Sequence, residues 1–372
     1  VAVNAIASRF KTSFSLNENQ QISVSARRSF TDLFRSPTYQ AFFDKVFQET
    51  VLTNFQNEEN IPLAVDEDFW FFDTSLRYEN QLNSNDKLAL NGLAIGTQLD
   101  FEQIDLENNT TQKNELDQES YLFSADYTHD WNQKISTFLL AQFSYYQQNA
   151  KDNTVGSRLQ TDQLNEVIDA GLTLNNEYHL NENWQLNGGY EFSEIGIRNN
   201  VNVSSLSVIR QQKNVSRRHS AFVDADYSTD NIRLYAGGNT TYFEAFDKWV
   251  FSPRLSFETE IVRNLTGGIN AEMKYQASSQ VIDLQGDFFG VAQPRWVLAN
   301  GENIPVLESR QVDAGLTYQV KDWLLQLTAY QKKVEGINSR SQGFTNQLEL
   351  LDLIGNYEVS GLEFFVQKKL EN

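Results

Sequence analysis

Apolar side chains recur at every second position along most of this chain, and this alternation constrains the fold more than any other feature. In residues 311–320 the even positions hold Val312, Ala314, Leu316, Tyr318 and Val320. The odd positions between them are polar residues or glycine, and residues 121–129 and 184–193 alternate in the same way. A period of two places each set on one face of a β-strand. The sequence therefore predicts strands with one apolar face and one polar face.

The connections between these strands also alternate, between short and long. Short turns rich in Asn and Asp occur at 17–19, 83–86, 132–133, 181–183, 229–231, 263–264 and 321–322. Longer polar segments separate them at 31–67, 104–118, 150–164, 199–214, 279–307 and 338–354. Short turns on one side and long loops on the other are typical of an outer-membrane β-barrel. We expect an all-β, antiparallel transmembrane barrel with about fifteen strands present, since strands of about 10–15 residues exceed the 9–11 that a bilayer requires.

Composition narrows the functional classes. The sequence has no run of 18 apolar residues, so it predicts no transmembrane helix. A formal net charge of -19 argues against binding to nucleic acid phosphates. Cysteine is absent, which excludes disulfides and thiolate metal sites. The chain begins at Val1 in strand-like sequence without a signal peptide and stops at Asn372 just after a strand, so we expect both ends to continue in a longer protein.

Two further elements depart from plain strands. Seven aromatic residues near the short turns predict an interfacial girdle: Tyr78, Tyr127, Trp131, Tyr178, Trp184, Tyr227 and Trp323. Ser36 and Pro37 form a helix-start signal, and apolar residues after them fall near helical spacing, which predicts a short helix over 37–54 within a long loop. An irregular loop is the alternative for that segment.

Three motifs follow one another within residues 251–365. Phe251-Ser252-Pro253-Arg254-Leu255 comes first, then Glu308-Ser309 followed by Gly315-Leu316-Thr317-Tyr318, and last Gly355-Asn356 followed by Gly361-Leu362-Glu363. Their order resembles that of the later barrel strands of TonB-dependent receptors, and Arg27-Arg28-Ser29-Phe30 resembles the sequence of such receptors from Bacteroidetes. The resemblance implies a 22-stranded barrel in the outer membrane of a Gram-negative bacterium, closed by an N-terminal plug domain. Against that pattern, residues 1–372 read as a partial barrel domain from which the plug is absent.

The resemblance implies energy-coupled uptake of a scarce nutrient such as a ferric siderophore, haem, cobalamin or a glycan. The implied partners are outer-membrane lipid and lipopolysaccharide, the nutrient, and the inner-membrane energy-coupling complex, which acts through the plug. The alternatives are an outer-membrane barrel of another class, either an enzyme or porin-like, and a soluble all-β binding protein. We expect no enzymatic activity, because neither a catalytic motif nor a rim cluster of catalytic residues is evident.

Candidate ligand contacts are few. Arg217, Arg218 and Arg295 are the basic residues that we would link to an anionic ligand, with solvated or acid-paired arginines as the alternative. Phe288, Phe289 and Trp296 lie in the polar segment 279–307, where exposed rings stack on sugars or chelators unless the loop packs on itself. His129, His179 and His219 fall on different predicted strands without metal-ligand spacing, so we expect no metal and no cofactor.

Overall fold

The computed structural model describes residues 1–46, 63–105, 110–155, 160–203, 208–288, 291–301, 303–342 and 350–369. These residues form one large curved sheet, with a single α-helix, α1 (Pro37–Val46), and one 3₁₀ turn, η2 (Glu244–Phe246). No helix in the described residues combines the length and the apolar character that a membrane span needs.

Within the described residues the chain forms eighteen strands. The first half contains β1 (Ala2–Val3), β2 (Ala7–Asn17), β3 (Gln20–Ser29), β4 (Leu63–Gln81), β5 (Asp86–Asp105), β6 (Thr110–Asn132), β7 (Ile135–Val155), β8 (Gln160–His179) and β9 (Trp184–Val203). The second half contains β10 (Val208–Ser228), β11 (Ile232–Phe243), β12 (Lys248–Val262), β13 (Leu265–Gln276), β14 (Ser278–Phe288), β15 (Val291–Leu298), β16 (Leu307–Val320), β17 (Trp323–Gln342) and β18 (Leu350–Lys368).

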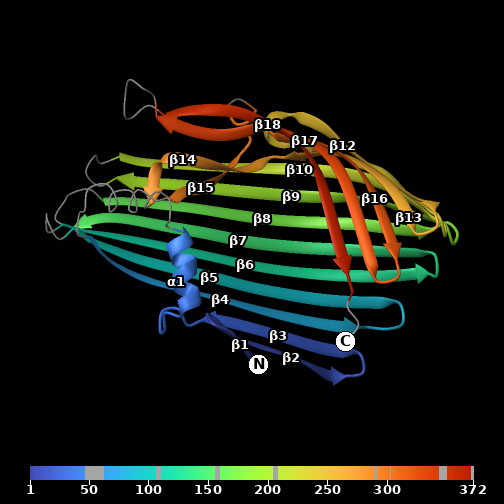
Figure 1. Cartoon of the computed structure of the whole chain (residues 1–372), viewed down its shortest axis with the longest axis horizontal. Coiled ribbons are helices and arrows are strands. Elements are labelled where there is room, and N and C mark those ends of the chain that lie inside the picture. Colours follow the sequence, from blue (N-terminus) through green and yellow to red (C-terminus); the bar gives the residue numbers. More distant parts are fainter. Residues whose placement is uncertain are drawn as a thin grey trace.

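The strands pair in chain order with one excursion. Antiparallel ladders run without interruption from β2 to β13, and β13 then pairs with β16, which continues to β17 and β18. The intervening β14 and β15 form a separate hairpin. Figure 1 shows the sheet curling, so that β16–β18 pass in front of its middle strands. The wall therefore contains fifteen strands, twelve from β2 to β13 and three from β16 to β18.

The all-β antiparallel barrel class is confirmed, and the predicted number of about fifteen agrees with the wall strands. The three additional strands are the two-residue β1 and the β14–β15 hairpin. That hairpin occupies most of 279–307, which the sequence predicted as a loop. The other long segments are also shorter than expected, because the strands continue into them; β6, for example, has 23 residues and begins at Thr110.

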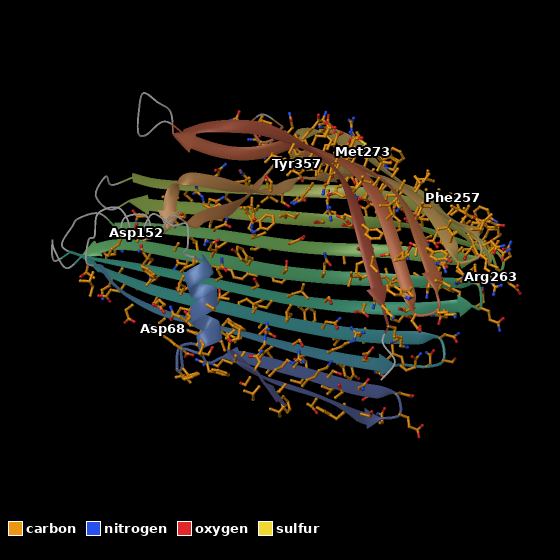
Figure 2. The ribbon with its side chains drawn as sticks, in the orientation of Figure 1. Asp68, Asp152, Phe257, Arg263, Met273 and Tyr357 are labelled. Atoms are coloured by element: carbon orange, nitrogen blue, oxygen red, sulfur yellow. The ribbon has the colours of Figure 1, made fainter. Side chains whose placement is uncertain are left out.

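The short turns gather at one end of the wall, which we call the turn end, and the opposite end is the loop end. Figure 2 places Arg263 at the turn end, and Asp68 and Asp152 toward the loop end. The turns are closed by Asn side chains that accept backbone hydrogen bonds; Asn132 Oδ1, for instance, accepts from the amides of Lys134 (2.8 Å) and Ile135 (3.1 Å). Asn and Asp favour such turns because their side chains replace a backbone acceptor.

The wall has a convex and a concave face with opposite chemistry. Directly paired residues on neighbouring strands point to the same face, so the apolar positions of one strand lie opposite the apolar positions of the next. On the convex face, for example, Phe123 lies opposite Phe143 and Ala125 lies opposite Ala141. Large apolar side chains on that face are exposed, among them Phe10, Phe123, Phe143, Leu172, Val223, Phe251, Leu316 and Phe364. Exposure of so much contiguous apolar surface is expected only against lipid or a partner.

The predicted aromatic girdle is present on the convex face. All seven residues lie at the turn end of their strands, and Trp184 is directly opposite Tyr227 with ring centroids 4.8 Å apart. Trp131 is 63% exposed, so its ring projects outward and does not pack in a core. The Trp131 Nε1 donates to Thr137 Oγ1 at 2.9 Å, which leaves the ring apolar on one side and hydrogen-bonded on the other.

Candidate functional site

The concave face is lined by polar side chains that bond to one another across strands. Asn91 Nδ2 donates to Ser124 Oγ (3.1 Å) and to Asp126 Oδ1 (2.9 Å), which joins β5 to β6. On the other side of the wall, Asn270 Nδ2 donates to Asp313 Oδ2 at 2.7 Å and joins β13 to β16. These bonds satisfy amide and carboxylate groups that point into the enclosed space. The concave face is therefore suited to water and polar ligands.

Ion pairs add fixed charge to the same surface. Arg27 pairs with Asp73 across β3 and β4, and Arg218 pairs with Glu191 across β9 and β10. Lys274 pairs with Glu272 of its own strand at 2.8 Å. The partners are partly exposed, so each pair contributes little to stability and mainly fixes the position of its charges.

Helix α1 begins at the predicted signal. The Tyr39 amide donates to Ser36 Oγ at 3.1 Å, and the Gln40 amide donates to the Ser36 carbonyl at 3.0 Å. Ser36 is therefore the N-cap, and Pro37 occupies the first helical position, where its missing N–H costs nothing. The helix prediction for 37–54 is confirmed for Pro37–Val46, and residues 47–54 lie outside the described residues.

This helix lies over the concave face (Figure 1). The Tyr39 ring stacks on Phe69 of β4 with centroids 6.4 Å apart. Just before the helix, Arg35 reaches two neighbouring acids of β4, Asp66 at 3.0 Å and Glu67 at 3.3 Å. Burial raises the pKa of the Tyr39 phenol to about 12, so it stays neutral at physiological pH. Asp66 and Glu67, which fall in the predicted polar segment 31–67, belong to β4.

The β14–β15 hairpin is a second element folded onto the concave face. Asn165 of β8 is 2% exposed, and its side chain bonds both to the Trp296 amide (3.3 Å) and to the Trp296 carbonyl (3.4 Å). Asn199 of β9 donates to the same carbonyl at 3.1 Å and accepts from Asn165 at 2.8 Å. Two wall asparagines thus hold the backbone N–H and C=O of one residue of β15.

The hairpin is also attached to the opposite part of the wall. Ile282 and Asp283 of β14 form a short parallel ladder with residues 339–340 of β17. Asn338 Nδ2 donates to Ser279 Oγ at 3.1 Å in a buried contact. The segment after β15 packs into a small apolar cluster in which Ala299 and Val306 meet Phe243 and Val250 of β11 and β12. The hairpin therefore spans the space between β8–β9 and β17.

The predicted ligand contacts fall in different places. Arg217 and Arg218 are consecutive, so their side chains lie on opposite faces. Arg217 is on the convex face, where it pairs with Glu194 at 2.6 Å, and Arg218 is on the concave face with Glu191. Arg295 and Trp296 belong to β15, and Phe288 ends β14. Phe289 lies outside the described residues. The structure brings the Trp296 backbone to the wall asparagines Asn165 and Asn199, which the sequence interpretation missed.

The three histidines lie on three separate strands, β6, β8 and β10, each beside a carboxylate. His129 is 2.6 Å from Asp86, His179 is 2.6 Å from Glu177, and His219 is 2.8 Å from Glu244. His219 also shares a hydrogen bond of 2.5 Å with the Tyr190 hydroxyl. Across the described ranges, no three His, Cys, Asp or Glu residues gather in an arrangement that would hold a metal ion.

The family described as "TonB dependent receptor-like, beta-barrel" matches residues 55–367. Among solved structures, the siderophore receptor PirA from Pseudomonas aeruginosa superposes with a TM-score of 0.58 at 13% identity, over 96% of this chain and 58% of that one. The outer membrane transporter YddB from Escherichia coli gives 0.64 at 9% identity, over 97% and 51%. The copper transporter OprC gives 0.62 at 9% identity, over 98% and 57%. No curated protein matches the sequence significantly.

These identities are low, so the structural likeness concerns the fold alone. The chain spans 51–58% of the length of these three structures. Nearly all of the chain takes part in each superposition, and the family match covers both the β4–β13 wall and the β16–β18 wall.

Proposed function

This chain belongs to the TonB dependent receptor-like β-barrel family, and we propose that it forms the wall of a receptor that imports a scarce nutrient into the bacterium. The protein is located in the outer membrane. Its convex face meets lipid and its concave face surrounds the transport path. In this proposal the loop end faces the outside of the cell and the turn end faces the periplasm.

The observation that carries the proposal is the way α1 and the β14–β15 hairpin fold onto the concave face. A passive pore needs an open lumen, whereas a receptor needs surfaces that touch its ligand near the mouth. Arg35 and Tyr39 tie the first element to β4, and Asn165 ties the second to β8. Both elements therefore occupy fixed positions where an incoming ligand would pass.

We propose Arg218, Arg295 and Trp296 as ligand contacts, and we retain Phe288 and Phe289 as contacts proposed from the sequence. Arg217 is a weaker candidate because its side chain lies on the convex face with Glu194. Cationic and aromatic groups together fit a bulky anionic chelate or a glycan. The ligand classes that we propose are ferric siderophores, haem, cobalamin and glycans. Support for the first comes from the siderophore receptor PirA among the similar structures.

Transport in this proposal needs an energy-coupling step. A plug domain inside the barrel would have two states, and the inner-membrane energy-coupling complex would shift the plug from one to the other by pulling on it. The ligand must bind these states with different affinity, because a ligand that binds both equally shifts nothing. The barrel wall itself stays fixed and presents the ligand to the plug.

The test is uptake by the source bacterium with and without the gene that encodes this chain. Cells are offered radiolabelled ferric siderophores, haem, cobalamin and oligosaccharides, with and without a protonophore. The expected result is loss of uptake of one nutrient class in the deletion strain, and equal loss in protonophore-treated wild-type cells. Uptake that depends on the gene but persists with the protonophore would show a passive pore and refute the proposal.

A second arm tests the site. Trp296→Ala and Arg218→Gln are introduced into the chromosomal gene, with Arg233→Gln in β11 near the turn end as the matched control. The two site variants are expected to weaken ligand binding to whole cells while the control retains it. Equal binding by all four strains would remove these residues from the proposal.

A further inference from the structure

Asn114 of β6 has a buried side chain without hydrogen-bond partners. It is 1% exposed, and neither its Nδ2 donor nor its Oδ1 acceptor has a partner. Within the described residues it is the only side chain whose donor and acceptor are both buried and unpaired. It lies ten residues along β6 from Ser124, so it is on the concave face. A buried polar group of this kind indicates that something else completes its bonding.

A carboxylate lies directly opposite this amide. Asp152 of β7 is the register partner of Asn114, and both side chains are on the concave face. Figure 2 shows Asp152 toward the loop end of the wall. Gln112 Nε2, one step nearer the loop end on β6, donates to Asp152 Oδ1 at 3.2 Å. Three side chains with oxygen atoms therefore meet between β6 and β7.

The lysines nearest in sequence point to the other face of the sheet. Lys151 precedes Asp152, but its side chain is on the convex face, where it pairs with Glu115 at 2.8 Å. Lys113 precedes Asn114 and pairs with Glu102 on the convex face at 3.0 Å. Within the described part of the chain, no basic side chain forms an ion pair with Asp152. Its charge is therefore not matched from within the wall.

The surroundings of the three polar side chains are apolar. Phe101 of β5 is directly opposite Asn114 and is 3% exposed. One step toward the turn end, Leu116 lies opposite the buried Ala150. Because apolar groups do not solvate a charge, burial raises the pKa of the Asp152 carboxyl. A cation bound beside Asp152 would remove this penalty by matching its charge.

The position along the barrel axis places this cluster outside the bilayer. Asn114 lies 13 residues beyond the girdle residue Tyr127 on β6. At a rise of about 3.3 Å per residue and a tilt of about 45°, it stands about 30 Å above the girdle, beyond an apolar band about 25 Å tall. Ions of the surrounding water therefore do not have to cross hydrocarbon to reach it.

The oxygen atoms of the cluster are ligands for a hard cation. Asp152 supplies a carboxylate, Asn114 a carbonyl oxygen, and Gln112 a second one, since its nitrogen is already used. Calcium accepts such mixed oxygen ligands with flexible geometry and with waters completing the shell, whereas magnesium demands a near-ideal octahedron. A grouping of three His, Cys, Asp or Glu residues is absent from the described residues, and this cluster needs none because two of its ligands are amides.

We propose that Asn114, Asp152 and Gln112 bind one calcium ion between the loop ends of β6 and β7. With a single carboxylate, the site belongs to the weak class, with a Kd of about 10⁻⁴–10⁻³ M. The ion satisfies the buried amide of Asn114, matches the charge of Asp152 and joins two neighbouring strands at the mouth of the wall. The inference does not depend on which nutrient is imported. The sequence analysis expected no metal because it considered histidine spacing, and ligands on neighbouring strands leave no such spacing.

The experiment uses the full-length protein in detergent micelles, stripped of metal with a chelator. Radioactive calcium is counted by equilibrium dialysis in about 0.1 M potassium chloride, which screens unspecific binding. One variant removes the charge (Asp152→Asn), and a second replaces the buried amide by an apolar group of similar size (Asn114→Leu). The matched controls change the same residue types on the convex face at the same level, Glu115→Gln and Asn153→Leu. Amide hydrogen exchange is measured in parallel with calcium, with magnesium and without either ion.

Wild type and both controls are expected to bind one calcium ion that each site variant binds about tenfold more weakly or loses. Calcium should slow exchange in residues 110–115 and 150–155 of wild type, and this effect should be absent from both site variants. Without calcium, Asn114→Leu should be at least as stable as wild type, because it removes an unsatisfied buried group. Equal calcium binding by all five proteins overturns the proposal. So does equal protection by magnesium, which would indicate general screening of the acidic surface.

Discussion

Two neighbouring residues of β7 give the sharpest test of the assignment of the two faces. Ala141 lies opposite Ala125 and Leu172 on the convex face, whereas Gln142 lies opposite Ser124 and Gly171 on the concave face. Both positions are exposed. An arginine at either position therefore meets no packed core, and the only difference between the two variants is the medium that surrounds the new charge.

The expected magnitude follows from the depth of Ala141. It lies six residues beyond Ile135, the first residue of β7 at the turn end. With a rise of about 3.3 Å per residue and a tilt of about 45°, Ala141 stands about 14 Å into a hydrocarbon layer about 30 Å thick. Arginine at the bilayer midplane costs about 2–4 kcal/mol in the wall of a barrel. Ala141→Arg should lose that amount, and Gln142→Arg should change the free energy of unfolding by about 0.5 kcal/mol or less.

The assay is reversible unfolding of the purified protein in phospholipid vesicles by guanidinium chloride, followed by tryptophan fluorescence. Ala141→Leu serves as the control for side-chain volume and should leave the free energy of unfolding near that of wild type. Equal losses for the two arginine variants, or a larger loss for Gln142→Arg, would refute the assignment of the convex face to lipid.

Two further predictions concern the loop end of the wall. Asn165→Ala should lower the free energy of unfolding by about 1–3 kcal/mol, because the Trp296 backbone and the Asn199 side chain lose a buried partner. Amide hydrogen exchange in β15 should become faster in this variant than in the β8 control Gln163→Ala. Equal exchange rates in the two variants would contradict the assigned contact. Asp32 accepts hydrogen bonds from Arg28 at 2.7 and 3.2 Å, and this contact holds the pKa of its carboxyl below the ordinary value. Its contribution is therefore present at neutral pH and is lost as the pH falls below about 3.9, the ordinary pKa of the unfolded carboxyl, and through the lower folded value. Unfolding measured from pH 6 to pH 2.5 should show a shallower acid limb for Asp32→Asn than for wild type. Parallel curves for the two proteins would contradict the prediction.

The wall strands were predictable because each one carries its own signal. Within the hydrocarbon, one face of a strand must be apolar and the other need not be, so alternation appears in every segment without reference to its neighbours. That signal fades where the strands leave the bilayer. At the start of β6, residues 110–115 are all polar, so the sequence shows no apolar face in this part of the strand. The sequence therefore predicted the strands but placed their loop ends several residues too early.

The elements inside the wall were less predictable because they depend on contacts between distant residues. Ser36 and Pro37 carry a local signal, so α1 was found. The β14–β15 hairpin was not, since Pro294 within β15 weakens a strand signal and its neighbours lack clear alternation. What fixes the hairpin is the pairing of Asn165 with Trp296, which are 131 residues apart. A buried asparagine looks like any other polar wall residue until its partner is known.

The attachment of the β14–β15 hairpin at both ends has a mechanical consequence. A thin-walled cylinder flattens easily across its diameter, and a tie between two points of its circumference resists that flattening. With β14 joined to β17 and β15 joined to β8 and β9, the mouth keeps a fixed cross-section when one side is loaded. A ligand that reaches the β14–β15 hairpin therefore meets an opening of fixed width.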